Sequence, residues 1–387
     1  MNNYNLPDLL MLLASAQGIF LGVFILHKYS SLLANRFLAT LMFLHAAILL
    51  EMSLQTIIGL EENSRVVMFV IGLSFLVPPL HYLYAKYLTR PGETPTRREF
   101  LHCIPFLVFE VLVLAFYRPE SLGISSHSSA EWNNKFGFFH LVVVLQYGAY
   151  LIQTQRVLRR YSQRVHEVFS TLEKIKLTWL RDITWLAMFV VFVYGLEYML
   201  LSMGIWTGDY FVFSSFLLVF YVYAMGYLGL FKSEVLSSSP LREALQSAPD
   251  SQRTSDDQSS PAKYSKSGLN AEDLAHYQDK LLSVMTQNSP QSESSLTLDQ
   301  LAAMVGLSPH NLSEVINRGL NQNFFDFVNG YRVQQVQESL LDPKKTHLTV
   351  LALSLEAGFA SKSTFNSIFK KHTGLTPTAW RKQHSNS

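Results

Sequence analysis

Two polar stretches near the carboxyl end of the chain carry side chains that can hydrogen-bond to the edges of base pairs. The first, SPHNLSEVIN, includes Asn311 and Glu314, and the second, SKSTFNSIFKK, includes Asn366 among several hydroxyl groups. An asparagine amide can bind adenine through two hydrogen bonds, a carboxylate can accept one from cytosine, and a hydroxyl suits either base. The alternative interpretation is that both stretches are solvated helix faces without a partner.

Positively charged side chains accompany both stretches and are suited to binding phosphate. They are Arg318, Lys362, Lys370, Lys371 and Arg381. Contacts of this kind fix the register of a protein on a duplex but carry no sequence information. From position 295 onward nine Lys and Arg stand against six Asp and Glu. The region is therefore only weakly basic, and its charge alone is a weak indicator of nucleic-acid binding.

The elements that must position these side chains form an internal repeat. In LTLDQLAAMVGLSPHNLSEVIN, Thr297 and Gln300 predict a capping box, Gly306 allows a sharp turn, and Ser308 followed by Pro309 predicts a new helix start. This is the layout of a helix-turn-helix.

A second copy of the pattern follows later in the chain. In LTVLALSLEAGFASKSTFNSIFKKHTG, Gly358 marks a turn that is one residue longer, Ser361 caps the next helix and Gly374 ends it. Between the copies, the stretch Phe324–Leu341 predicts a helix roughly 27 Å long at 1.5 Å per residue. A spacer of that length can hold two recognition helices about one DNA turn apart, near 34 Å.

The first part of the chain has a different composition, with apolar runs close to the roughly 20 residues that cross a hydrocarbon core. We predict seven spans, at Leu9–Leu26, Phe37–Ile58, Val66–Leu88, Leu101–Tyr117, Phe136–Ile152, Ile183–Met203 and Tyr210–Phe231. The connections on one side hold thirteen Lys and Arg, whereas those on the other hold only Arg65, Arg118 and Lys135. The positive-inside rule therefore predicts that the amino terminus lies outside and the carboxyl terminus in the cytosol.

Polar groups within these spans are candidates for a sensor pocket, because intramembrane carboxylates are costly and suggest function. With the amino terminus outside, Glu51, His140 and Glu197 fall in the outward half, and Glu110 lies mid-span. The alternative is that these groups make buried hydrogen bonds between helices. The single cysteine, Cys103, excludes a disulfide framework and a thiolate metal cluster, and we expect no cofactor or metal.

Residues 233–268 are rich in Ser, Pro, Gln, Asp and Lys and poor in aromatic residues. Such a segment cannot bury enough apolar area to offset its ordering entropy, so we predict a flexible linker. The predicted domains are a polytopic transmembrane domain of seven helices at 1–232, this linker, and a soluble helical domain at 269–387. The fold class is therefore all-α.

The two repeats, the joining helix and the stretch GFASKSTFNSIFKKHTGLTP together resemble the DNA-binding domain of the AraC/XylS family of bacterial transcription regulators. Seven spans followed by this domain are similar to a membrane-embedded branch of that family. The resemblance implies base reading from the first two turns of each recognition helix. It assigns this role to His310, Asn311, Ser313, Glu314, Lys362, Ser363, Thr364, Asn366 and Ser367.

These features favour a membrane-bound transcription regulator of the bacterial inner membrane that responds to a signal at or outside the membrane. Its expected partners are promoter DNA, membrane lipids, RNA polymerase, an unknown small ligand and a second copy of the chain. The alternative is a transporter-like or receptor protein whose cytosolic domain binds other proteins, although matched broken helices are not evident. The chain has no P-loop, HExxH or GxSxG motif, so we expect no enzymatic activity.

Overall fold

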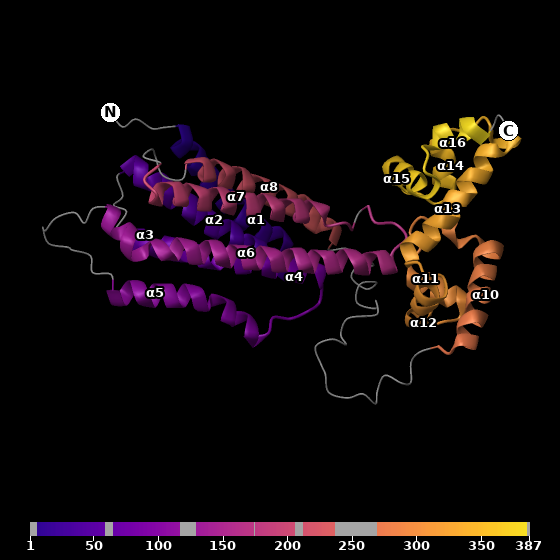
Figure 1. Ribbon diagram of the computed structural model, residues 1–387, viewed down its shortest axis with the longest axis horizontal. Helices are drawn as coiled ribbons and strands as arrows, with labels where there is room; N and C mark the ends of the chain where they lie inside the picture. Colours follow the sequence, from indigo (N-terminus) through magenta and orange to yellow (C-terminus); the bar gives the residue numbers. More distant parts are fainter. Residues whose placement is uncertain are drawn as a thin grey trace, which may run out of the picture. The chain divides into compact units, whose positions relative to one another are not determined.

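The computed structural model describes residues 6–58, 65–116, 129–173, 175–205, 212–236 and 269–384. Among these residues the chain forms helices and no strand, apart from one isolated antiparallel bridge between Phe169 and Thr297 (Figure 1). The predicted all-α class is confirmed for this part of the chain. The chain divides into two compact units, Met1–Arg160 with Leu177–Ser238, and Tyr161–Lys176 with Ser239–Ser387.

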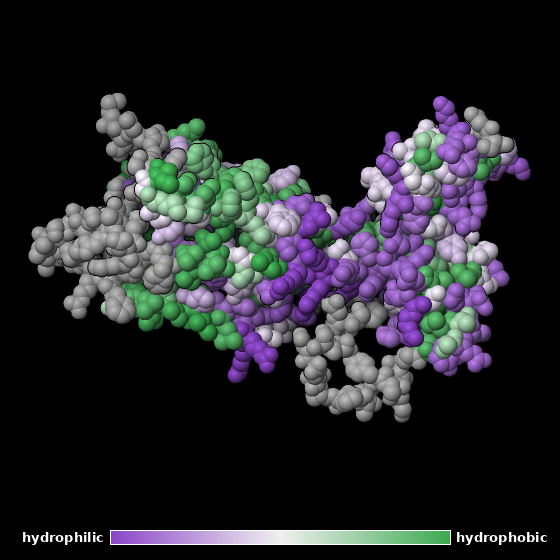
Figure 2. Space-filling model, viewed as in Figure 1, coloured by the Kyte–Doolittle hydropathy of each residue, from purple (hydrophilic) through white to green (hydrophobic). Residues whose placement is uncertain are grey.

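The first unit is a bundle of long apolar helices in which α1 packs against α2 and α8, α2 against α4, and α7 against α8. A buried hydrogen bond of 2.8 Å from the Ser15 hydroxyl to the Ala46 carbonyl joins α1 to α2. Figure 2 shows hydrophobic residues over the surface of these helices. The helices are α1 Leu6–Tyr29, α2 Leu33–Ile58, α3 Arg65–Leu73, α4 Val77–Thr89, α5 Ile104–Phe116, α6 Ser129–Val168, α7 Thr178–Ser202 and α8 Val212–Leu236.

Five stretches in the described residues are long and apolar enough to cross a membrane. They are Leu6–Tyr29, Leu33–Gln55, Arg65–Thr89, Thr178–Ser202 and Phe213–Phe231. Helix α5 has only 13 residues, and the run predicted at Phe136–Ile152 lies within α6, whose side chains are described from Phe139 onward. The total of seven spans therefore stays a prediction.

The third span is interrupted at its centre by a 3₁₀ turn, Ser74–Leu76, between α3 and α4. Proline has no N–H, so Pro79 cannot donate to the carbonyl of Phe75 one turn earlier. The side-chain amide of Gln146 on α6 donates to that carbonyl instead, at 3.0 Å. A residue from a neighbouring helix thus satisfies the backbone group that the proline leaves free.

The second unit contains seven further helices in the described part of the chain. The joining helix was predicted at Phe324–Leu341, and α13 has these bounds. Helix α8 ends at Leu236, so the first residues of the predicted 233–268 linker continue that helix, and 237–268 lie outside the described residues. The helices are α10 Ala271–Asn288, α11 Leu298–Val305, α12 Pro309–Glu314, α13 Phe324–Leu341, α14 Val350–Glu356, α15 Lys362–Thr373 and α16 Pro377–His384.

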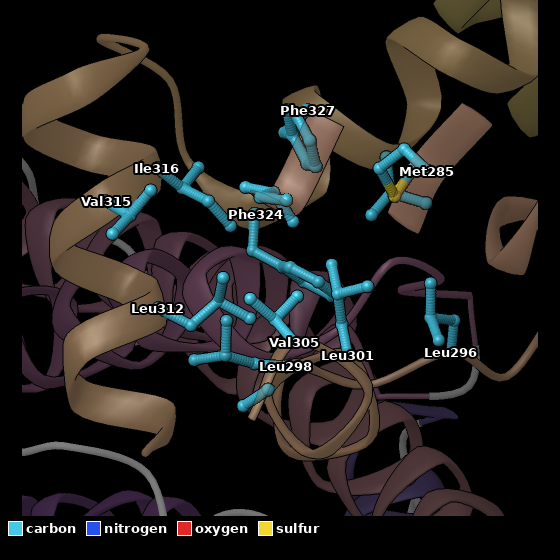
Figure 3. Packing of buried hydrophobic residues seen from close by; sticks show 13 residues of the cluster. Met285, Leu296, Leu298, Leu301, Val305, Leu312, Val315, Ile316, Phe324 and Phe327 are labelled. Carbon is cyan, nitrogen blue, oxygen red and sulfur yellow. The ribbon is translucent and has the colours of Figure 1, made fainter. Parts of the chain in front are cut away.

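Each helix-turn-helix has its own apolar centre. In the first, Leu301 and Val305 of α11 pack with Leu312 of α12 and with Phe324 and Phe327 of α13 (Figure 3). In the second, a chain of edge-on aromatic rings runs along Phe359, Phe365, Phe369 and Trp380, with centroids 5.2, 5.5 and 6.0 Å apart. Aromatic pairs at these distances add to the stability that burial provides.

The predicted caps of the two motifs are confirmed. The amide of Thr297 donates to the Gln300 side chain at 2.9 Å, and the amide of Gln300 donates back to the Thr297 hydroxyl at 3.3 Å. Ser308 and Ser361 each accept from a backbone amide in the first turn of α12 and α15. Gly306 and Gly374 end their helices with φ of 76° and 77°.

Candidate nucleic-acid interface

The first predicted recognition helix, α12, is short and continues into one π-helical turn, Val315–Gly319. Its buried face carries Leu312, Val315 and Ile316. On the other side His310 is exposed, and Asn311, Ser313 and Glu314 are half-buried. The predicted reading residues therefore lie on the side of α12 that the core leaves free, but only His310 is fully accessible.

Two of the predicted contact residues on this motif bind each other. The guanidinium of Arg318 donates to the carboxylate of Glu314 one turn earlier, and only 12% of the Glu314 side chain is exposed. The Ser313 hydroxyl likewise accepts from the Asn317 amide at 3.1 Å. Glu314 therefore holds Arg318 in place in this structure, a role that the separate assignments to base and phosphate did not anticipate.

The second predicted recognition helix, α15, has a clear division between its faces. Phe365, Ile368 and Phe369 are buried. The opposite face exposes Lys362, Ser363, Asn366, Ser367 and Lys370, while Thr364 is half-buried and its amide is capped by Ser361. A row of exposed polar groups on a helix with one apolar face is the arrangement needed to enter a major groove.

The basic residues predicted to bind phosphate differ in their surroundings. Lys371 makes an ion pair of 2.8 Å with Asp326 at the start of α13, so it also joins the second motif to the connecting helix. Burial raises the pKa of the Asp326 carboxyl, but the hydrogen bond and charge of Lys371 outweigh this and lower the pKa overall. Lys370 is exposed and Arg381 on α16 is half-buried.

The connecting helix carries a buried arginine that sequence reasoning missed. Arg332 has no exposed surface and lies on α13 among Val328, Val333 and Val336, which are also buried. Its Nε donates to the carbonyl of Gln291 at 2.8 Å. The signal in the sequence was a charged residue inside the apolar stripe of α13. An arginine is almost never fully buried unless it is paired, so its position predicts polar partners from elsewhere in the chain.

The candidate sensor residues lie on four helices of the first unit. Glu51 on α2 is buried and accepts from the Gln55 amide. The His140 ring on α6 hydrogen-bonds to the Tyr194 hydroxyl and stacks on Tyr198 at 4.5 Å, both from α7. The contacts of His140 are of the kind that hold helices together within an apolar surrounding, whereas Gln55 lies on the same helix as Glu51.

The remaining two candidates differ in their partners. Glu197 on α7 accepts from the backbone amides of Phe213 and Ser214 at 2.9 and 3.2 Å, and so caps the first turn of α8. On α5, the Oε1 atom of Glu110 is buried and has no hydrogen-bond partner among the described residues. His140 thus contacts α7, the helix that carries Glu197, whereas Glu51 lies on α2 and Glu110 on α5.

A second buried polar network was not among the predicted sites. The two ring nitrogens of His81 on α4 hydrogen-bond to the Tyr221 hydroxyl on α8 at 2.9 Å and to the Thr184 hydroxyl on α7 at 3.1 Å. The ring of His45 on α2 lies 5.3 Å from that of Tyr221. The network connects four helices of the first unit. Its only signal in the sequence is that these polar residues occur within apolar runs.

Two helix-turn-helix motifs, joined by α13 and each presenting a polar helix face, define the carboxyl-terminal part of the second unit as a double helix-turn-helix domain. Residues 301–383 match the family model described as a helix-turn-helix domain. This finding and the curated relatives support the AraC-type resemblance of this part of the chain. The family model and the curated relatives each match about a quarter of the chain or less.

The chain is 28% identical over 106 residues to the melibiose operon regulatory protein of Escherichia coli K12, covering 27% of this chain and 33% of that protein. It is 29% identical over 91 residues to an HTH-type transcriptional regulator, YtdP, of Bacillus subtilis, covering 24% of this chain and 11% of that protein. The chain thus spans a third or less of these relatives' length. A solved structure of a Listeria innocua protein of unknown function is 29% identical, covers 27% of this chain and 95% of its own, and has a TM-score of 0.24.

Proposed function

We propose that this protein is a sequence-specific, DNA-binding transcription regulator held in the bacterial inner membrane by its amino-terminal helices. The observation that carries the proposal is the pair of helix-turn-helix motifs, joined by α13, whose polar helix faces lie on the sides that the apolar cores leave free. The names of the curated relatives, which are operon and transcription regulators, support the same class. The alternative, that these polar stretches are only solvated helix faces, does not explain why the helix-turn-helix motif occurs twice with a helix that joins the two copies.

In this proposal α15 makes the main base contacts. The exposed amide of Asn366 pairs with adenine, and the hydroxyls of Ser363 and Ser367 reach neighbouring bases. His310, Asn311 and Ser313 serve the same purpose on α12, with Glu314 positioning Arg318 toward phosphate. Lys370 and Arg381 bind phosphate, and Lys362 and Thr364 lie at the start of α15, where a backbone phosphate approaches helix amides.

The membrane assignment rests on the five long apolar helices and on the large hydrophobic side chains that the first unit exposes. Surface residues such as Phe20, Leu114 and Phe192 are 66%, 75% and 65% exposed, and large exposed apolar surfaces of this kind mark sites of interaction with membranes or other proteins. The excess of Lys and Arg on one side supports a cytosolic location of the double helix-turn-helix domain.

The signal enters, in this proposal, from outside or from the membrane itself. A small ligand binds among the outward halves of the helices, with Glu51, His140, Glu197 and Glu110 as candidate contacts. Its binding changes the pairing of two copies of the chain, and pairing raises the effective concentration of the second DNA domain to about millimolar. Promoter binding then recruits RNA polymerase.

DNA binding is tested by genome-wide mapping of DNA bound by the tagged full-length protein, followed by binding assays with the enriched duplex. Replacement of Asn366 by Ala should reduce discrimination at one base pair by about 1–3 kcal/mol. Lys370→Ala, the matched control on the same exposed face, should weaken all duplexes alike and reduce the salt dependence. Equal loss for every sequence with both variants would exclude base reading by Asn366.

Topology is tested separately with phosphatase fusions, which are active only when exported. Fusions after Leu60 or His127 should be active, and fusions after Arg98, Arg164 or Ser239 should be inactive. An active fusion after Ser239 would remove the regulator proposal, because the DNA-binding domain would never meet DNA.

A further inference from the structure

The end of α6 and the connection from α6 to α7 belong to the same compact unit as the double helix-turn-helix domain. Residues Tyr161–Lys176 group with that unit, although the chain before and after them belongs to the first unit. The boundaries predicted from sequence placed this segment within the transmembrane domain at 1–232. We call residues 166–173 the docking segment, and the contacts that follow lie within the second unit.

The docking segment pairs through its backbone with the loop that precedes α11. Phe169 forms the antiparallel bridge with Thr297. The amide and the hydroxyl of Ser170 both donate to the carbonyl of Leu296, at 3.3 and 2.7 Å. The hydroxyl of Thr171 donates to the carbonyl of Ser294 at 2.5 Å. Directional backbone contacts of this kind specify one register of one segment, as when an extended peptide adds to a strand edge.

Side chains of α13 complete the binding of Ser170. Its carbonyl accepts from the Asn329 amide at 3.1 Å and from Arg332 Nη1 at 3.1 Å, and its hydroxyl accepts from Arg332 Nη2 at 3.1 Å. Arg332 also donates to the carbonyls of Gln291 and Glu293. The acceptors are neutral oxygens, so the buried guanidinium is stabilised by the number of its hydrogen bonds. Burial lowers the pKa of Arg332 to about 10, and the group stays charged at neutral pH.

Removing the docking segment would therefore expose the guanidinium of Arg332 to solvent or leave some of its N–H groups without an acceptor. Ser170 is 1% exposed and Leu172 is 1% exposed. The His166 ring contacts Phe325 of α13 edge-on at 5.1 Å. These are the features of a specific interface and not of a chance surface contact.

The end of the docking segment reaches the second recognition helix. The Ser361 hydroxyl, which caps α15, donates to the carboxylate of Glu173. The amino terminus of a helix attracts anions, and at a recognition helix that anion is a DNA phosphate. The carboxylate of Glu173 would then repel the phosphate backbone and occupy the capping hydroxyl when α15 approaches a duplex.

We propose that the docking segment is a binding site for the double helix-turn-helix domain and competes with DNA for it. The docked form holds Arg332 and Ser361 and binds DNA weakly. A signal that moves α6 relative to α7 alters the segment between them, releases the domain and raises its DNA affinity. This inference rests on the proposed function for its second half only, because docking is a property of the chain with or without DNA.

The test uses the full-length protein in phospholipid nanodiscs, with the natural Cys103 replaced by Ser. Thr171→Cys and Ser294→Cys should form a disulfide on mild oxidation, whereas either cysteine alone should not. Absence of the cross-link would overturn docking. The oxidised protein should bind a fluorescein-labelled duplex of the enriched sequence about tenfold more weakly than the same protein after reduction. Equal affinity in both redox states would overturn the competition.

A charge variant gives an independent measurement without a cross-link. Glu173→Gln keeps the shape of the side chain and removes its charge, and should strengthen DNA binding about threefold or more. Glu338→Gln removes one charge from the exposed face of α13 and should change affinity less than twofold. Equal effects of the two variants would show that Glu173 acts only through net charge. If no duplex is bound in any state while the cross-link still forms, the proposed function fails and docking stands.

Discussion

The guanidinium of Arg332 donates a 3.1 Å hydrogen bond to the carbonyl oxygen of Ser170, a residue 162 positions earlier in the chain. The bond joins the helix that connects the two helix-turn-helix motifs to the segment between α6 and α7. Because Arg332 is fully buried, this relationship makes the stability of the DNA-binding domain depend on a segment that the sequence places between two apolar helices.

Replacing Arg332 by Ala should destabilise α13 by about 3 kcal/mol, because the buried carbonyl of Gln291 loses the Arg332 donor and the carbonyls of Ser170 and Glu293 each lose one of two donors. Hydrogen exchange of peptides covering α13 in the full-length protein measures this locally. Arg318→Ala is the control, since Arg318 is 61% exposed and its ion pair with Glu314 is worth about 0.5 kcal/mol. Similar exchange rates in both variants would contradict the prediction.

Gly358 and Gly374 form a matched pair with different expected outcomes. Both have positive φ, 94° and 77°, but a Cβ at Gly358 would lie 2.3 Å from the Gln291 carbonyl, and one at Gly374 would meet nothing within 4 Å. Gly374→Ala should cost about 1–2 kcal/mol, the left-handed backbone penalty. Gly358→Ala should cost clearly more, because the clash adds to the same penalty. Protease resistance of the domain reports both, and equal losses would show that the Gln291 loop yields freely.

Gln146 and Pro79 should be energetically coupled through the carbonyl of Phe75. Gln146→Met removes the donor to this carbonyl and should cost about 1–2 kcal/mol in the wild-type background. In a Pro79→Ala background the new backbone amide can donate in its place, so the same change should cost less. A double-mutant cycle on thermal unfolding in detergent measures the difference. If the free-energy changes of the two substitutions were strictly additive, the backbone amide at position 79 would not replace the Gln146 amide as donor to Phe75.

The ion pair between Lys371 and Asp326 should lose its stabilising effect in acid. The pKa of the Asp326 carboxyl is lower in the folded protein than its ordinary value. A carboxyl of this kind contributes stability above its ordinary pKa, about 4, and loses that contribution as the pH falls further. Asp326→Asn should therefore cost about 0.5 kcal/mol at pH 7, because Lys371 is 65% exposed. The difference between wild type and variant in thermal midpoint should shrink below pH 4, and a constant difference would contradict this assignment.

Local features of the second unit were predictable from sequence because they depend on neighbours along the chain. The capping box of Thr297 and Gln300, the helix start at Ser308 and the bounds of α13 are all decided within a few residues. Caps and helical periodicity act over one or two turns, so residue types at fixed spacing predict them. The polar face of α15 follows from the same periodicity.

The positions of the long apolar helices could be predicted from the sequence. The number of membrane spans and the contacts between the helices could not be predicted in full. A span needs about 20 apolar residues, and α5 has only 13. The interruption at Ser74–Leu76 follows from Pro78 and Pro79, yet the donor that repairs it comes from Gln146 on another helix. Residue spacing contains no information about which distant side chain reaches a free carbonyl.

The amino-acid sequence by itself determined the helical class, the apolar and polar halves, and the two helix-turn-helix motifs with the helix between them. Only the tertiary structure decided that Lys371 binds Asp326 and that Arg332 binds Ser170. The physical reason is the range of the forces involved. Helix formation is governed by local backbone hydrogen bonds, whereas a buried cation takes whatever acceptors the folded chain brings within 3 Å of it.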